Sequence, residues 1–124
     1  MLGSMEAARR QDDVIRVGEL EVHPGQGLAL AAGTALSLSV REFGLLVALA
    51  RSGGRIVRRD DLYRLVWGGS LRDGDRSIDV YVHKLRVKLE DALPDVRFIH
   101  THVGFGYRFA PESSRAFHIP ATGR

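Results

Sequence analysis

The sequence predicts a small α+β domain in which a four-stranded antiparallel sheet comes first, three helices follow and a β-hairpin ends the fold. Three observations lead to this prediction. Short apolar runs, broken by glycine and proline, fill residues 14–38. Apolar residues at helical spacing begin after Ser39 and recur in three segments. Two further apolar runs with glycines between them end near residue 110, which is typical of a hairpin.

Length and composition indicate one folded domain. A chain of 124 residues has room for a single hydrophobic core, and its 44% hydrophobic and 27% charged residues are ordinary for a globular protein. The net charge of +3 favours polyanions only slightly. Because the chain has no cysteine, disulfides, thiolate zinc sites and cysteine nucleophiles are excluded, and we expect a cytoplasmic location.

The two ends differ from the middle. Residues 1–13 are polar and are predicted to be a flexible tail or linker, with a Gly3-Ser4-Met5 junction typical of a cloning scar. Residues 111–124 are predicted to be a second flexible tail, so the domain should span 14–110. We expect no membrane association, because the longest nearly uncharged run, Pro24 to Val40, is broken by glycines, and no signal peptide is visible.

The predicted sheet consists of four short runs separated by turn residues. These runs are Val14–Val17, Leu20–Val22, Leu28–Leu30 and Ala35–Leu38. A sheet of this size is not stable alone and must pack on another element.

The first helix should begin at a capping box formed by Ser39 and Glu42 and should end at residues 52–54. We expect four of its residues to face the core: Phe43, Leu46, Val47 and Ala50. The second helix is predicted over Arg59–Trp67. Its expected inward-facing residues are Leu62, Leu65, Val66 and Trp67.

The third helix, predicted from Arg76 to about Asp91 with Asp75 as its N-cap, carries the candidate chemistry. Its buried stripe should be Ile78, Val82, Leu85 and Leu89. The outward face contains Arg76, Val80, His83, Lys84 and Val87, flanked by Ser77, Arg86 and Lys88. Hydrogen-bond donors mixed with exposed valines suit the DNA major groove, where guanine accepts and the thymine methyl is apolar. A solvated helix whose valines pack on a neighbour is the alternative, and composition alone does not decide between them.

The setting of this helix favours DNA. It follows another helix after a turn and precedes a hairpin predicted over 97–101 and 107–110, which is the helix-turn-helix-plus-wing order. Gly104 and Gly106 lie between two strands, so they are not a dinucleotide fingerprint. His100 and His102 share one strand face, but two ligands are too few for zinc, so we expect no metal, no cofactor and no enzyme activity.

Five segments together resemble the effector domain of OmpR/PhoB-type response regulators, which belong to bacterial two-component systems. They are residues 38–46, 54–62, 66–68, 75–90 and 99–109, within a match over about 14–110. The resemblance implies a winged helix with residues 76–90 in the major groove, the wing at 102–106 near the minor groove, and loop 68–75 touching RNA polymerase. The residues that it assigns to double-stranded DNA are Arg76, Ser77, Val80, Tyr81, His83, Lys84, Arg86, Lys88, Thr101, His102 and Arg108.

Three positions depart from the family pattern. Val103 replaces the usual wing arginine, His83 stands where a basic or small polar residue is common, and Arg58 replaces a serine. We therefore expect His102 or Arg108 to substitute in part for the wing arginine. A dimer on DNA is expected, because one helix reads few bases. The alternative function is a winged-helix protein-interaction module that docks a partner through the valine-bearing face.

Overall fold

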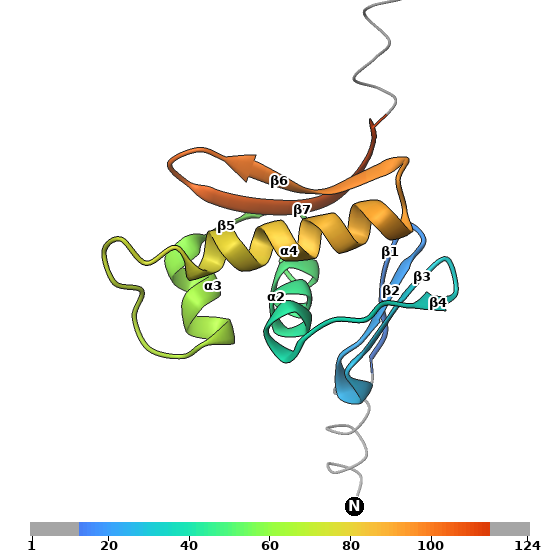
Figure 1. Ribbon diagram of the computed structural model, residues 1–124, viewed down its shortest axis with the longest axis horizontal. Coiled ribbons are helices and arrows are strands. Elements are labelled where there is room, and N and C mark those ends of the chain that lie inside the picture. The colour runs from blue at the N-terminus through green and yellow to red at the C-terminus, as the bar shows by residue number, and fades with distance from the viewer. Residues whose placement is uncertain (1–12, 115–124) are drawn as a thin grey trace, which may run out of the picture.

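The computed structural model describes residues 13–114, and Gly3-Ser4-Met5 and most of both predicted tails lie outside them. Helix α4 (Ser77–Ala92) crosses the molecule (Figure 1). The hairpin of β6 (Val96–His102) and β7 (Gly106–Ser113) lies along one side of α4. Helices α2 (Val40–Ala50) and α3 (Arg59–Val66) lie on the other side, and the N-terminal sheet packs near the C-terminal end of α4.

The N-terminal sheet is the predicted antiparallel meander, in the order β1-β2-β3-β4. Its strands are β1 (Ile15–Val17), β2 (Leu20–His23), β3 (Leu28–Ala31) and β4 (Thr34–Ala35). A single 3-10 turn, η1 (Pro24–Gln26), joins β2 to β3. The fourth strand was predicted too long, because Leu36 and Leu38 leave the sheet to pack against the core ahead of α2.

Helix α2 begins at the predicted capping box. The Ser39 backbone N–H donates to Glu42 Oε1 at 2.8 Å, and the Glu42 N–H donates to Ser39 Oγ at 3.2 Å. The predicted core face was incomplete, because the buried apolar residues of the helix are Leu45, Leu46 and Leu49, of which only Leu46 was predicted. The other three predicted core residues, Phe43, Val47 and Ala50, pack against the core but are only partly buried.

Strand β5 (Ile56–Arg58) was not predicted, since three residues show too little periodicity. It pairs with β7, which makes the hairpin part of a three-stranded sheet in the order β5-β7-β6. Gly106 makes this pairing possible, because a Cβ there would lie 2.1 Å from the Val57 carbonyl oxygen. Strand β7 also continues to Ser113, beyond the predicted boundary at residue 110.

The helix order agrees with the prediction, but one inward-facing residue does not. Helix α3 buries Leu62, whereas Leu65 is 68% exposed. Helix α4 buries all four residues of its predicted stripe, Ile78, Val82, Leu85 and Leu89. That stripe joins a single core with the buried leucines of α2 and with Phe98 and Phe109 of the hairpin, whose rings stack at 5.5 Å.

Candidate nucleic-acid interface

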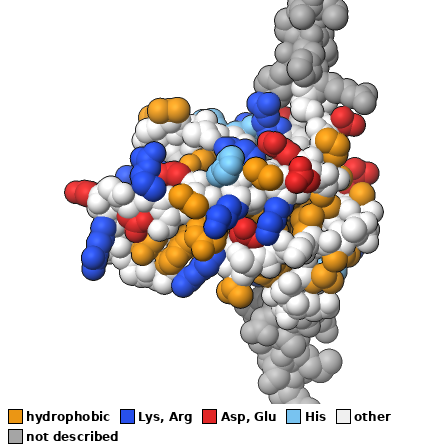
Figure 2. Space-filling view, viewed as in Figure 1, with side chains coloured by type: hydrophobic (Ala, Val, Ile, Leu, Met, Phe, Trp, Pro, Cys, Tyr) orange, Lys and Arg blue, Asp and Glu red, His pale blue; other side chains and the backbone are white. Residues whose placement is uncertain are grey.

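The exposed face of α4 combines basic side chains with apolar ones. Arg76, just before the helix, and His83 and Lys84 within it are exposed. Val80 and Val87 are 47% and 41% exposed. In Figure 2, Lys and Arg, histidine and hydrophobic side chains alternate across the surface that α4 occupies. The buried stripe of Ile78, Val82, Leu85 and Leu89 on the opposite side fixes the helix to the core, so the exposed side chains start from a rigid backbone.

The start of α4 is held by Asp75. Its Oδ1 accepts hydrogen bonds from the Ser77 backbone N–H at 2.8 Å and from Ser77 Oγ at 2.6 Å. These bonds hold the pKa of the Asp75 carboxyl below its ordinary value. The predicted N-cap was wrong by one residue, because the helix begins at Ser77 and Arg76 is its N-cap, but the Asp75 side chain still satisfies the free N–H of the first helical residue. The Ser77 hydroxyl donates inward to Asp75 and positions the helix end.

Asp79 joins three elements behind the exposed face. Its carboxylate accepts bonds from Arg59 of α3 at 2.8 and 3.2 Å and from the Tyr107 hydroxyl of β7 at 2.6 Å. Arg76 lies 3.6 Å from it. Burial alone would raise the pKa of Asp79, but these bonds outweigh burial and lower it. Burial and the bond to Asp79 raise the pKa of Tyr107 to about 12.

A ladder of rings fixes α3 and the root of loop 68–75 against α4. Tyr63 stacks on Trp67 at 5.4 Å, and Trp67 meets the edge of Tyr81 at 5.3 Å. Arg41 lies over Trp67 at 5.2 Å, and the Lys84 ammonium lies 4.8 Å from the Tyr81 ring centre. Tyr81 is therefore a support for Lys84, and Trp67 is only half-buried within the ladder.

Arg86 ties α4 to the wing strand. One of its guanidinium nitrogens donates to the Ile99 carbonyl and to Thr101 Oγ1, both at 3.0 Å. Thr101 therefore faces α4, and its hydroxyl accepts from Arg86. These two predicted site residues meet and fix the distance between helix and wing.

Lys88 lies on the α2 side of the helix. Its ammonium donates to Glu42 Oε1 at 2.6 Å and to the Ser37 carbonyl at 2.7 Å. Burial would raise the pKa of Glu42, whose side chain is 5% exposed, but the Lys88 and Ser39 bonds lower it. The prediction that Lys88 faces DNA is not supported by this position, because its charge neutralises a buried carboxylate.

The wing turn carries two exposed apolar side chains. Val103 is 88% and Phe105 is 71% exposed, and the Phe105 N–H closes the turn onto the His102 carbonyl at 2.9 Å. Gly104 has φ +81° there. A hollow of about 480 Å³ separates this turn from the starts of α3 and α4. Phe105 therefore does not cover the core.

His102 and Arg108 lie on the other face of the hairpin. Since Tyr107 faces α4 and neighbouring residues of a strand alternate, Arg108 points away from α4. Arg108 donates to Glu112 Oε2 at 2.9 Å and to His102 Nε2 at 3.3 Å. The bond from Arg108 holds the pKa of Glu112 below its ordinary value. Within residues 13–114, no group of three or more His, Asp and Glu side chains is placed to hold a metal.

Arg59, Asp79 and Arg41 are structural partners of the site that the sequence analysis did not identify. The available signal was Asp79 itself, an acidic residue inside an otherwise basic helix face. Its partners come from distant segments, so sequence spacing could not reveal them.

Comparison with known proteins gives a consistent picture. Residues 33–109 match the family model described as "Transcriptional regulatory protein, C terminal". The chain is 37% identical over 94 residues to the transcriptional regulatory protein CreB of Escherichia coli, covering 76% of this chain and 41% of CreB. It is 35% identical to RstA of the same organism, covering 90% of this chain and 46% of RstA. The chain thus spans less than half the length of these relatives.

Solved structures agree in fold. The RstA DNA-binding domain of Klebsiella pneumoniae in complex with RstA box matches with a TM-score of 0.72 and 34% identity, over 81% of this chain and 99% of that one. The DNA-binding domain of CpxR from E. coli matches with a TM-score of 0.73 and 34% identity, over 79% and 96%. Among the described helices, none is long and apolar enough to cross a membrane. The family match, the sequence identity and the shared winged-helix fold together show that this chain belongs to the OmpR/PhoB-type family of C-terminal effector domains of transcriptional regulators.

Proposed function

We propose that this chain binds double-stranded DNA sequence-specifically as the effector domain of a bacterial response regulator, with α4 in the major groove. The observation that carries the proposal is the exposed α4 face, where cations alternate with Val80 and Val87. Arginine and lysine donate to guanine, and valine methyls contact the thymine methyl. The crystallised complex of the related RstA domain with its DNA supports this role.

The contacts divide into two groups. Arg76, Val80, His83 and Lys84 are the residues that we assign to DNA, because their side chains are exposed on one face. Four other predicted site residues hold that face in place through the bonds and rings described above: Ser77, Tyr81, Arg86 and Thr101. Lys88 is not among the residues that we propose to contact DNA, because its ammonium is bonded to Glu42.

The wing is proposed to approach the minor groove with apolar side chains. Residues 102–106 contain no Lys or Arg, and Val103 and Phe105 are the exposed side chains of the turn. Apolar residues in a minor groove widen it and favour easily deformed base steps. The hypothesis that His102 or Arg108 replaces the family arginine has less support, because Arg108 points away from α4 and is paired with Glu112.

Binding as a dimer, contact of loop 68–75 with RNA polymerase and action in the bacterial cytoplasm belong to the same proposal. Loop 68–75 projects beyond the N-terminal end of α4, where a second protein could reach it (Figure 1). A transcription-regulator domain of this kind has no need of catalytic groups or cofactors.

Selection of bound duplexes from a random-sequence pool, at roughly 150 mM salt where non-specific binding is weak, tests the proposal. Enrichment of a short motif, repeated at about one helical turn if the domain dimerises, is the expected result. A folded protein that enriches nothing contradicts it.

The alternative is a protein-interaction module that uses Val80 and Val87 as its contact. Phosphate contacts make affinity fall steeply with salt, whereas a largely apolar interface does not. A salt titration of any captured ligand therefore separates the two functions.

A further inference from the structure

Helix α2 has apolar side chains on two opposite sides. Its buried residues, Glu42, Leu45, Leu46 and Leu49, form one stripe. At 100° per residue, Phe43, Val47 and Ala48 lie on the other side, centred about opposite that stripe. These three side chains are partly buried against the core, yet they also line an open groove, so part of their apolar surface has no covering partner within residues 13–114.

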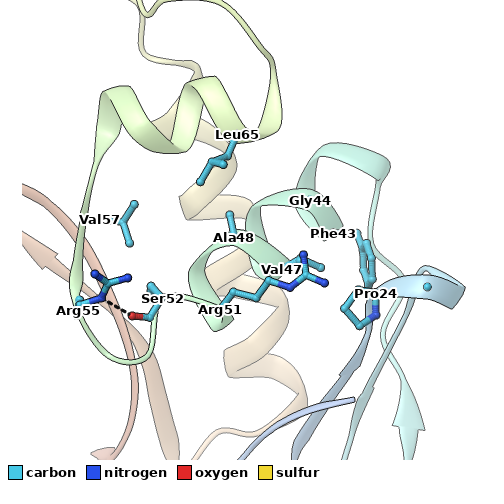
Figure 3. Close-up of a pocket in the computed structure, with 11 residues that line it drawn as sticks. Pro24, Phe43, Gly44, Val47, Ala48, Arg51, Ser52, Arg55, Val57 and Leu65 are labelled. Carbon is cyan, nitrogen blue, oxygen red and sulfur yellow. Dashed lines mark hydrogen bonds between the residues drawn. The ribbon is translucent and has the colours of Figure 1, made fainter. Parts of the chain in front are cut away.

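The second side of α2 opens on a groove of about 810 Å³. Figure 3 shows Leu65 of α3 reaching over Ala48, with Val57 of β5 at one end and Pro24 of η1 at the other. Leu65 is 68% exposed, although it sits at an apolar position of an amphipathic helix. The groove therefore accounts for the incomplete burial of Phe43 and Val47 and for the exposure of Leu65.

The rim of this groove is positively charged. Among its eleven lining residues are two arginines, Arg51 and Arg55, and no acidic residue. Both arginines are exposed. Arg55 donates to the Ser52 carbonyl at 3.0 Å, and within residues 13–114 neither guanidinium is paired with a carboxylate. Because both guanidinium groups are exposed and have no carboxylate partner among these residues, they are available to a ligand.

The groove also lies away from the proposed DNA surface. Helix α4 packs against the buried stripe of α2, as the Lys88–Glu42 bond marks, and the groove lies on the opposite side of α2. A partner in the groove and DNA on α4 would not compete for space.

We propose that this groove, defined by Phe43, Val47, Ala48 and Leu65 with Arg51 and Arg55 on its rim, docks an amphipathic protein segment. The segment presents large apolar side chains to the floor and Asp or Glu side chains to the two arginines. Two to three turns of an amphipathic helix supply that pattern at i, i+3/i+4 and i+7. A regulator that uses both surfaces brings the protein that carries this segment to the bound DNA.

Peptide selection tests the proposal with the whole 124-residue chain. A phage-displayed library of random peptides about 15 residues long, enough for about four helical turns, is selected on the protein. We expect enriched peptides with apolar residues at helical spacing and at least one Asp or Glu. Their affinity should fall about tenfold or more in Leu65→Ser and in the double variant Arg51→Glu, Arg55→Glu.

Val103→Ser is the matched control, because Val103 is also an exposed aliphatic residue, at 88% against 68% for Leu65, but lies on the wing. This variant should keep full peptide affinity. DNA affinity should be unchanged in Leu65→Ser, so failure here is distinguishable from failure of the DNA proposal. No enrichment, enriched peptides without acidic residues, or equal binding to wild type and Leu65→Ser would overturn the inference. If a groove variant fails to fold, an enriched peptide is titrated into the wild-type chain and followed by NMR. The peptide-induced chemical-shift changes must then be largest at Phe43, Val47 and Leu65.

Discussion

Replacing Asp79 by alanine should loosen the junction between the wing, α3 and α4. The change removes the acceptor of the Tyr107 hydroxyl and of the two Arg59 bonds. Tyr107 is 7% exposed, so its hydroxyl loses its partner without gaining water, which costs about 1–3 kcal/mol. The Arg59 pair is about one-third exposed, so its loss adds only about 1 kcal/mol. Together, Asp79→Ala should lower the free energy of unfolding by about 3 kcal/mol.

Urea denaturation of four proteins measures this value: wild type, Asp79→Ala, Tyr107→Phe and the double variant. Tyr107→Phe alone should lose about 1 kcal/mol, because Asp79 keeps Arg59. The double-mutant cycle should give a coupling free energy of about 1 kcal/mol. An Asp79→Ala protein within about 0.5 kcal/mol of wild type would refute the reasoning, since that is the range of ordinary surface changes.

The same junction has a pH signature with a definite sign. The pKa of Asp79 is lowered in the folded protein, so the unfolded chain binds its proton more readily. The contribution of Asp79 is therefore present above its ordinary pKa of about 3.9 and is lost as the pH falls toward the folded value. Asp79→Asn should lack this part of the acid destabilisation. The difference in free energy of unfolding between wild type and Asp79→Asn should therefore fall as the pH is lowered and become constant at low pH.

Four further predictions concern other residues of the helix, the wing and the junction. Lys88→Ala should lower the free energy of unfolding by about 2 kcal/mol, because it leaves the buried Glu42 carboxylate unpaired, yet it should not weaken DNA binding by the folded protein. Lys84→Ala should lower the free energy of unfolding by no more than about 1 kcal/mol, because only its exposed contact with the Tyr81 ring is lost. It should weaken DNA binding by about 1–3 kcal/mol, and only for the selected motif if Lys84 reads a base. Lys88→Ala is its matched control in a fluorescence anisotropy titration. Val103→Arg should strengthen binding and steepen the dependence of log K on log salt by about one unit, and an unchanged slope would place the wing away from DNA. Tyr107 should ionise near pH 12 in a spectrophotometric titration, so stability is lost as the pH rises from about 10 toward that value, and Tyr107→Phe should abolish this alkaline phase.

Several elements could be predicted because their signals are local. The Ser39–Glu42 capping box needs only four consecutive residues, and it forms as expected. The stripe of Ile78, Val82, Leu85 and Leu89 extends over about three turns, so one helical phase fits it far better than any other. Ordered motifs from the first helix to the wing then indicated the family, which the match over residues 33–109 confirms.

Other features depend on contacts between distant segments. Strand β5 is a strand because β7 lies beside it, and Gly106 lets the two backbones approach. In α2 nearly every position is apolar, so periodicity could not tell the core side from the groove side, and the position of α4 decides it. Lys88 and Arg108 have long side chains whose carboxylate partners, Glu42 and Glu112, are set by how the helices and the hairpin pack.

The sequence alone was enough to predict the succession of sheet, three helices and hairpin, the helix start at Ser39, the buried side of α4 and the family, because each rests on spacing along the chain. Only the tertiary structure decided which basic residues remain available to a ligand. Glu42 lies 46 residues from Lys88 in sequence, and the pairing of their charges exists only when α2 and α4 pack together. Spacing along the chain predicts which side chains share a helix face, but the partner of a charged side chain is set by the residue that packing places opposite it.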